Sequence, residues 1–135
     1  MIELKKEHIN NPKLAYEIFQ KLLNNEDSIA QNREHFWVMC LDTRTSILSV
    51  ELVALGGLNT IILVNRDIFR RATIQGANSI IVCHNHPSGD ITPSSEDIDF
   101  TKRISQAGEL LGIQVNDHII ISTKAFYSMK EKGDI

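Results

Sequence analysis

The chain has 135 residues, of which 42% are hydrophobic and 23% are charged, a composition typical of one folded globular domain. Its net charge of −3 gives no global reason to bind nucleic acid. No uninterrupted apolar run approaches the roughly 20 residues of a membrane span, and the N-terminus lacks the apolar core of a signal peptide. Two cysteines, Cys40 and Cys83, form no disulfide framework, so we expect a cytoplasmic protein with buried free thiols.

The N-terminal half predicts one helix and a hairpin. Apolar residues recur at helical spacing after Pro12, which suits a first helical turn, and the helix fades in the polar residues 24–33. Residues 35–41 are aromatic and apolar and predict a strand. A turn at 42–45 connects that strand to a second one over 47–55, so the two are expected to pair.

The middle of the chain alternates between strands and helices. We expect a short strand over 60–64, and then a helix from Asn65 to Gly76. A buried strand follows over 79–84, and a loop rich in Pro, Gly, Asp and Ser occupies 85–93. A helical face then extends from Ser94 to about Leu111.

The C-terminal region predicts a strand over 113–122 and a last short helix over 123–133. The expected order is therefore α-β-β-(β)-α-β-α-β-α. This alternation indicates an α/β fold with a mixed central sheet flanked by helices on both sides.

Two histidines, His84 and His86, stand two residues apart where the buried strand ends. Side chains alternate along a strand, so both imidazoles leave on one side, while Cys83 and Asn85 leave on the other. Two adjacent imidazoles supply half of a tetrahedral zinc site. The carboxyl ends of strands are also where α/β folds place their ligand sites.

The loop returns the chain to a helix start, where Asp97 can supply a carboxylate ligand. Two histidines, one carboxylate and a water make the ligand set of a catalytic zinc. A simpler interpretation remains open, because Ser94 and Asp97 also fit a capping box. Thr92 is an alternative cap, and Asp90 is a rival carboxylate that better suits a turn beside a glycine.

The spacing H-x-H, seven residues, Ser, two residues, Asp resembles the signature of JAMM/MPN (JAB, Mov34-type) metalloproteases. The longer motifs HNHPSGD and DHII, with a final YS and EKG, look like those of the RadC family within that group. The similarity extends from about Glu34 to the C-terminus. The resemblance implies a JAMM/MPN, cytidine-deaminase-like architecture over 34–135, with residues 1–33 as an N-terminal helix packed on that domain.

The resemblance also implies roles for individual residues. His84, His86 and Asp97 would be the Zn2+ ligands, and Ser94 would hold the oxyanion or orient the water. The family requires a glutamate near the start of the first strand as general base. Glu34 occupies that place, and Glu51 on the next strand is the alternative.

His118 belongs to the DHII motif, and we expect it in the core or behind the ligands, because three ligands and a water complete a catalytic zinc site. His35 is expected to have a surface or structural role. The basic cluster Arg66, Arg70 and Arg71 fits a solvated helix face.

The resemblance therefore implies a zinc-dependent hydrolase of peptide or isopeptide bonds that acts on a peptide or protein substrate. RadC proteins commonly carry a helix-hairpin-helix region, and this sequence shows none, so nucleic-acid binding by this chain alone is not expected. The alternatives are a DNA-repair-associated nucleic-acid module and a non-catalytic, zinc-containing interaction scaffold. No membrane association is expected, and an exposed hairpin edge would be compatible with a homodimer.

Overall fold

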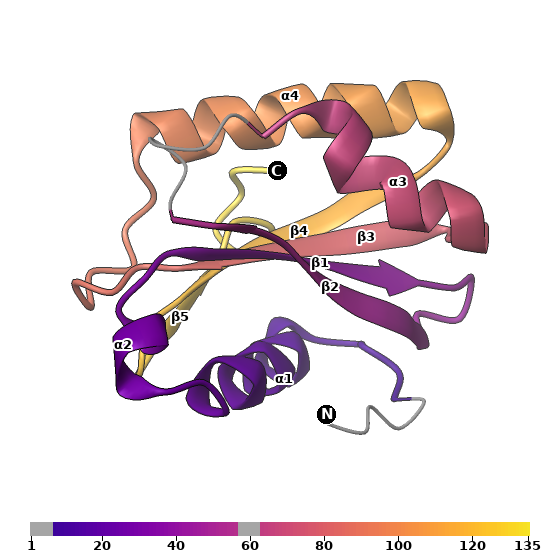
Figure 1. The fold of residues 1–135 in the computed structure, drawn as a ribbon. Coiled ribbons are helices and arrows are strands. Elements are labelled where there is room, and N and C mark those ends of the chain that lie inside the picture. The colour runs from indigo at the N-terminus through magenta and orange to yellow at the C-terminus, as the bar shows by residue number, and fades with distance from the viewer. Residues whose placement is uncertain (1–6, 57–62) are drawn as a thin grey trace.

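A computed structural model describes residues 7–56 and 63–135. Figure 1 shows the arrangement of the elements. In chain order these are α1 (Pro12–Asn24), α2 (Ser28–Gln31), β1 (His35–Leu41), β2 (Ile47–Leu55), α3 (Asn65–Gln75), β3 (Ser79–Asn85), α4 (Ser95–Leu111), β4 (Gln114–Ile121) and β5 (Phe126–Ser128).

The strands form one mixed sheet with the order β2-β1-β3-β4-β5. β1 is antiparallel to both of its neighbours, β3 and β4 are parallel, and β5 is antiparallel to β4. The parallel pair requires a crossover, which α4 provides. The structure confirms the predicted α/β fold with a mixed sheet flanked by helices.

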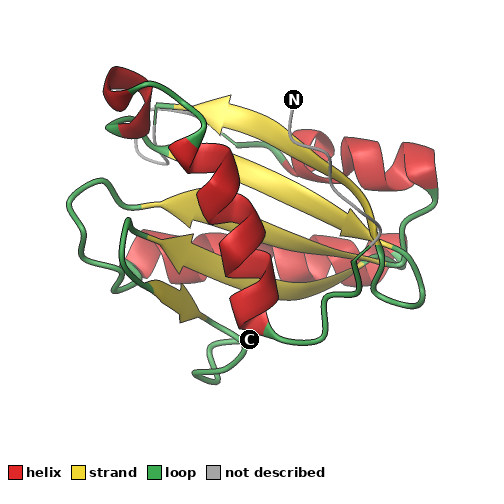
Figure 2. Cartoon of the chain, turned by 90° about the horizontal axis from the view of Figure 1, so that it is seen from below, coloured by secondary structure: helices red, strands yellow, loops and turns green. Residues whose placement is uncertain are grey.

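Helices cover both faces of the sheet, with α3 and α4 on one face and α1 on the other (Figure 1). Figure 2 shows the strands from below, with α1 lying across them. The alternating side chains of β1 and β3 therefore enter two separate apolar cores. Val82 packs on the side of α3 and α4, whereas Cys83 packs on the side of α1.

Local sequence fixes both ends of α4, the helix that positions the candidate site. Ser94 caps its N-terminus, and Gly112 ends it in the left-handed conformation with φ of 73°. Gly108 lies so close to Ile113, the residue before β4, that an added Cβ would be 2.3 Å from its carbonyl oxygen. These residues set the register of α4 against the sheet.

The C-terminal prediction is wrong in one respect. Residues 123–133 do not form a helix; Phe126–Ser128 form β5, which pairs with Ile119–Ile121 of β4, and turns follow. These three residues form a strand because their backbone pairs with the open edge of β4. The short helix α2 lies within the polar stretch where the first helix was expected only to fade.

The expected strand at 60–64 falls largely outside the described residues, and the described residues 63 and 64 are not in a strand. Both cysteines are buried and unpaired, as predicted. Within the described part of the chain, no helix is long and apolar enough to cross a membrane.

Candidate metal centre

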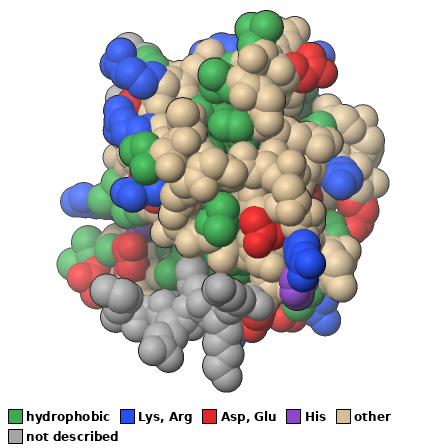
Figure 3. Space-filling model, turned by 90° about the vertical axis from the view of Figure 1, so that its right-hand side faces the viewer, with side chains coloured by type: hydrophobic (Ala, Val, Ile, Leu, Met, Phe, Trp, Pro, Cys, Tyr) green, Lys and Arg blue, Asp and Glu red, His purple; other side chains and the backbone are tan. Residues whose placement is uncertain are grey.

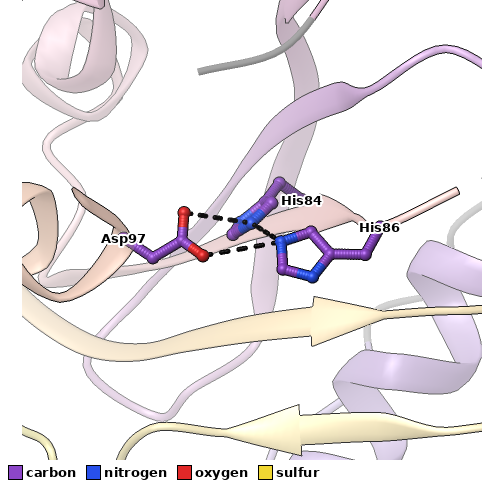
Figure 4. Close-up of side chains that lie close together, drawn as sticks. All are labelled: His84, His86 and Asp97. Atoms are coloured by element: carbon purple, nitrogen blue, oxygen red, sulfur yellow. Dashed lines mark hydrogen bonds and ion pairs between the residues drawn. The ribbon is translucent and has the colours of Figure 1, made fainter. Parts of the chain in front are cut away.

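Three side chains meet where β3 ends and α4 begins. His84 is the penultimate residue of β3, His86 follows the strand directly, and Asp97 lies in the first turn of α4. His84 and Asp97 are only 2% and 3% exposed, whereas His86 is partly exposed. Figure 4 shows the two imidazoles and the carboxylate pointing toward one another.

Two of the three distances between these groups match those around a tetrahedral ion. The Nε2 atom of His84 lies 3.4 Å from Oδ1 of Asp97, and Nε2 of His86 lies 3.5 Å from Oδ2. Ligand atoms at roughly 2.0–2.1 Å from a tetrahedral zinc lie about 3.4 Å from one another. The two Nε2 atoms are closer together, at 2.8 Å. The three residues can hold a metal ion, and two imidazoles with one carboxylate are a donor set that leaves a fourth position for water.

A hydrogen bond to the loop orients His86 for this purpose. Its Nδ1 lies 2.7 Å from the carbonyl oxygen of Asp90, and because a carbonyl only accepts, the hydrogen of the ring is on Nδ1. The turn that presents this carbonyl contains Gly89, whose φ of 90° favours glycine. The Asp90 side chain accepts from the backbone N–H of Thr92, as expected of a turn residue rather than a ligand.

The two imidazoles stabilise the ionised form of Asp97, and Asp97 in turn stabilises the protonated form of His86. Burial alone would raise the pKa of Asp97, but bonds from His84 and His86 outweigh it and hold that pKa well below its usual range. In turn, the bond to Asp97 raises the pKa of His86 above 6.5, and the carbonyl of Asp90 and the charge of Glu34 act in the same direction. Asp97 is therefore ionised, as a metal ligand must be.

His118 lies behind His84, fully buried. Its Nε2 is 2.7 Å from Nδ1 of His84, and its Nδ1 is 2.6 Å from the hydroxyl of Thr101 on α4. Burial, followed by the charge of His84, holds the pKa of His118 well below 6.5, so the ring is neutral. Its position agrees with the expectation of a core histidine behind the ligands. Thr101 was not predicted, although its place four residues after Asp97, one helical turn away, was a usable signal.

The two candidate bases differ in position. Glu34 precedes β1, whose second residue Phe36 is opposite His84 in the sheet, and its charge acts on His86. Glu51 lies opposite Val38, farther along the sheet, and its carboxylate is bound to Arg71 at 3.1 Å. Glu34 is thus beside the cluster, and Glu51 is engaged elsewhere.

Ser94 and Asp97 form the capping box that the alternative interpretation predicted. The Asp97 N–H donates to the Ser94 hydroxyl at 3.1 Å, and the Ser94 N–H donates to Oδ2 of Asp97 at 2.9 Å. The same carboxylate therefore takes part in both the helix cap and the metal cluster. Its Oδ2 accepts from the N–H of Ser94 and also faces His86. Ser94 is exposed at the rim of the cluster.

Asn85, between the two histidines, points to the opposite side of the sheet from them, as the alternation predicted. Its Oδ1 accepts from the backbone N–H of His35 at 2.6 Å, and its Nδ2 donates to the carbonyl of Arg33 at 3.0 Å. His35 itself is buried and bonds Glu26 at 2.7 Å. The sequence did not reveal this network, because it joins residues about 50 positions apart.

A mixed α/β sheet with a His-His-Asp cluster at the end of its central strand is consistent with a JAB-type domain. The model of the RadC-like JAB domain matches residues 9–134, so this chain belongs to that family. This finding confirms the resemblance seen in the sequence and extends it to include helix α1.

Two curated relatives that the chain resembles are named as UPF0758 proteins. One from Desulfitobacterium hafniense is 47% identical over 102 residues, which cover 76% of this chain and 45% of the relative. Another, from Clostridium botulinum, is 47% identical over 114 residues, covering 84% of this chain and 49% of the relative. The chain thus spans about half the length of the curated relatives it matches.

Proposed function

We propose that this chain is a zinc-dependent hydrolase domain that cleaves peptide or isopeptide bonds. The observation that carries the proposal is the convergence of His84, His86 and Asp97 on one point, with a glutamate beside them. Membership of the RadC-like JAB family agrees with a metallohydrolase. Zinc is the proposed ion because the donor set is two imidazoles and a carboxylate.

When bound, zinc lowers the pKa of a coordinated water toward about 7 and polarises the carbonyl of the substrate. Glu34 accepts a proton from the attacking water and passes it to the leaving amine. The hydroxyl oxygen of Ser94 accepts from the backbone N–H of Asp97. Its own hydrogen is then available to donate to the developing oxyanion. His118 stays neutral behind the ligands and contributes no charge.

The central experiment separates metal binding from hydrolysis. Purified wild-type protein is assayed for zinc by mass spectrometry and for cleavage of a peptide library that includes isopeptides linked through the lysine Nζ. We expect near-stoichiometric zinc and cleavage in the wild type, zinc without cleavage in Glu34→Gln, and neither in His84→Ala. Glu51→Gln is the matched control, because its carboxylate binds Arg71, and it should behave as wild type.

The alternatives predict other results. Cleavage that survives Glu34→Gln would contradict the assigned base, and zinc without any cleavage would favour an interaction scaffold. A nucleic-acid module would bind duplex DNA with steep salt dependence. On the face seen in Figure 3, several basic side chains lie along the left edge, and acidic side chains lie elsewhere on the same face, so this face is not uniformly basic.

A further inference from the structure

Four groups form a continuous chain of hydrogen bonds that starts at the helix and ends at a candidate ligand. The Thr101 hydroxyl lies 2.8 Å from the backbone carbonyl of Asp97, one turn earlier in α4. The same hydroxyl lies 2.6 Å from Nδ1 of His118, and Nε2 of His118 lies 2.7 Å from Nδ1 of His84. Thr101, His118 and His84 are all buried, so water does not compete for these bonds.

The hydrogens in this chain are limited in number, and their positions depend on one another. A hydroxyl carries one hydrogen, and a neutral imidazole carries one. If the Thr101 hydroxyl donates to the Asp97 carbonyl, it accepts from Nδ1–H of His118. The Nε2 of His118 is then an acceptor, so His84 carries its hydrogen on Nδ1 and keeps the Nε2 lone pair.

The opposite arrangement has the opposite consequence. If the Thr101 hydroxyl donated to His118, His118 would carry its hydrogen on Nε2 and donate to His84. His84 would then carry its hydrogen on Nε2, the atom that faces Asp97 and His86, and could not bind a metal there. A threonine inside a helix commonly donates to the carbonyl four residues back, which favours the first arrangement.

We propose that Thr101 and His118 are positioning residues that fix His84 as the Nδ1–H tautomer and so direct its Nε2 lone pair into the candidate metal centre. The relay couples the helix bearing Asp97 to the strand bearing His84, two ligands thirteen positions apart in the sequence. The proposal rests on the metal centre of the proposed function, but not on hydrolysis.

Nitrogen-detected tautomer assignment and zinc titration test this relay in the full chain. Long-range 1H–15N NMR of the metal-free protein at neutral pH should show hydrogen on Nδ1 of both His84 and His118. In Thr101→Val the His118 hydrogen loses its acceptor, so the His84 population should shift toward Nε2–H. Zinc affinity, measured by competition with a chromophoric chelator, should fall about 10- to 100-fold.

Two control variants separate the relay from a general effect on folding. Thr101→Ser keeps the hydroxyl and should retain both the tautomer and the zinc affinity of the wild type. Thr73→Val removes the same kind of bond in α3, where the hydroxyl donates to the carbonyl of Phe69 at 2.8 Å, and should leave zinc affinity unchanged.

The possible outcomes are distinct. Hydrogen on Nε2 and none on Nδ1 of His84 in the wild type overturns the relay, as does a Thr101→Val protein with unchanged tautomers and affinity. The wild-type spectrum decides the first point even if Thr101→Val fails to fold. Nδ1–H on both rings in a protein that does not bind zinc would support the relay while contradicting the proposed function.

Discussion

The side-chain oxygen of Asn85 accepts a hydrogen bond of 2.6 Å from the backbone N–H of His35. The same side chain donates to the carbonyl of Arg33 at 3.0 Å. Asn85 thus holds the backbone on both sides of Glu34, while its own neighbours in the chain are His84 and His86. One buried amide therefore links the proposed base to the two proposed imidazole ligands.

Replacing this amide should impair hydrolysis while leaving zinc in place. In Asn85→Ala the buried N–H of His35 loses its acceptor, which should lower the free energy of unfolding by about 1–3 kcal/mol. Displacing Glu34 by about 1 Å should reduce kcat by up to about 100-fold. Urea unfolding, zinc content and cleavage rates measure the three effects.

Asn116→Ala is the matched control for that prediction. The Asn116 side chain donates to the hydroxyl of Ser79 at 3.0 Å, at the opposite end of β3 from the site. The control should leave kcat unchanged. Equal cleavage rates in Asn85→Ala and wild type would show that Asn85 does not position Glu34.

Asp97 should contribute separately to helix stability and to metal binding. Asp97→Ala loses the side-chain half of the capping box, at a cost of about 1 kcal/mol in the free energy of unfolding of the metal-free protein. Asp97→Asn keeps an oxygen that can accept from the N–H of Ser94, so it should be more stable than Asp97→Ala. Both variants should lose zinc affinity, because neither has the anionic ligand.

The first turn of another helix offers the control for capping alone. Asn11 caps α1 by accepting from the N–H of Leu14 at 3.0 Å. Asn11→Ala should lose stability by a similar amount and bind zinc as wild type does. Tight zinc binding by Asp97→Asn would contradict the assignment of Asp97 as a ligand.

The stability of the metal-free protein should be greatest near pH 6.5. The pKa of His86 is raised in the folded state, so its contribution is fully present below 6.5 and is lost as pH rises through the raised value. The pKa of His118 is lowered, so its contribution is present above 6.5 and declines as pH falls below that value. Urea unfolding between about pH 5 and 8 measures both limbs.

Asp97→Asn distinguishes the loss of stability above pH 6.5 from the loss below it. Asp97→Asn removes the main cause of the raised pKa of His86, so the free energy of unfolding should fall less as pH rises above 6.5. The decline of the free energy of unfolding below pH 6.5 should remain, since burial is the main cause of the lowered pKa of His118. A wild-type stability that rises steadily from pH 6.5 to 8 would contradict the prediction for His86.

Strong local patterns were enough to predict most of the fold. Residues 35–41 and 47–55 match β1 and β2 as the structure has them, because each is a long apolar or alternating run bounded by turn residues. The strand β5 could not be predicted, since three residues carry no periodicity. Its conformation depends on pairing with β4, which is a tertiary contact.

The candidate site also contains residues that local sequence predicts and residues that only tertiary contacts reveal. His84, His86 and Asp97 are close in sequence, so strand alternation and a helix start were enough to bring them together. His118 bonds His84, which is 34 positions away in the sequence, and Thr101 bonds His118, which is 17 positions away. The direction of those bonds depends on how α4 packs against β4, which no local pattern encodes.

Zinc should stabilise the folded chain in proportion to its binding. At a free zinc concentration 100-fold above Kd, the free energy of unfolding should rise by about 2.7 kcal/mol, and a chelator should reverse the rise. The gain should shrink as pH falls through the raised pKa of His86, because a proton on Nε2 competes with the metal. His86→Ala should lose the gain at every pH, whereas His8→Ala, at an exposed histidine that bonds the carbonyl of Arg44, should keep it. An equal zinc effect in His86→Ala and wild type would place the ion elsewhere on the protein.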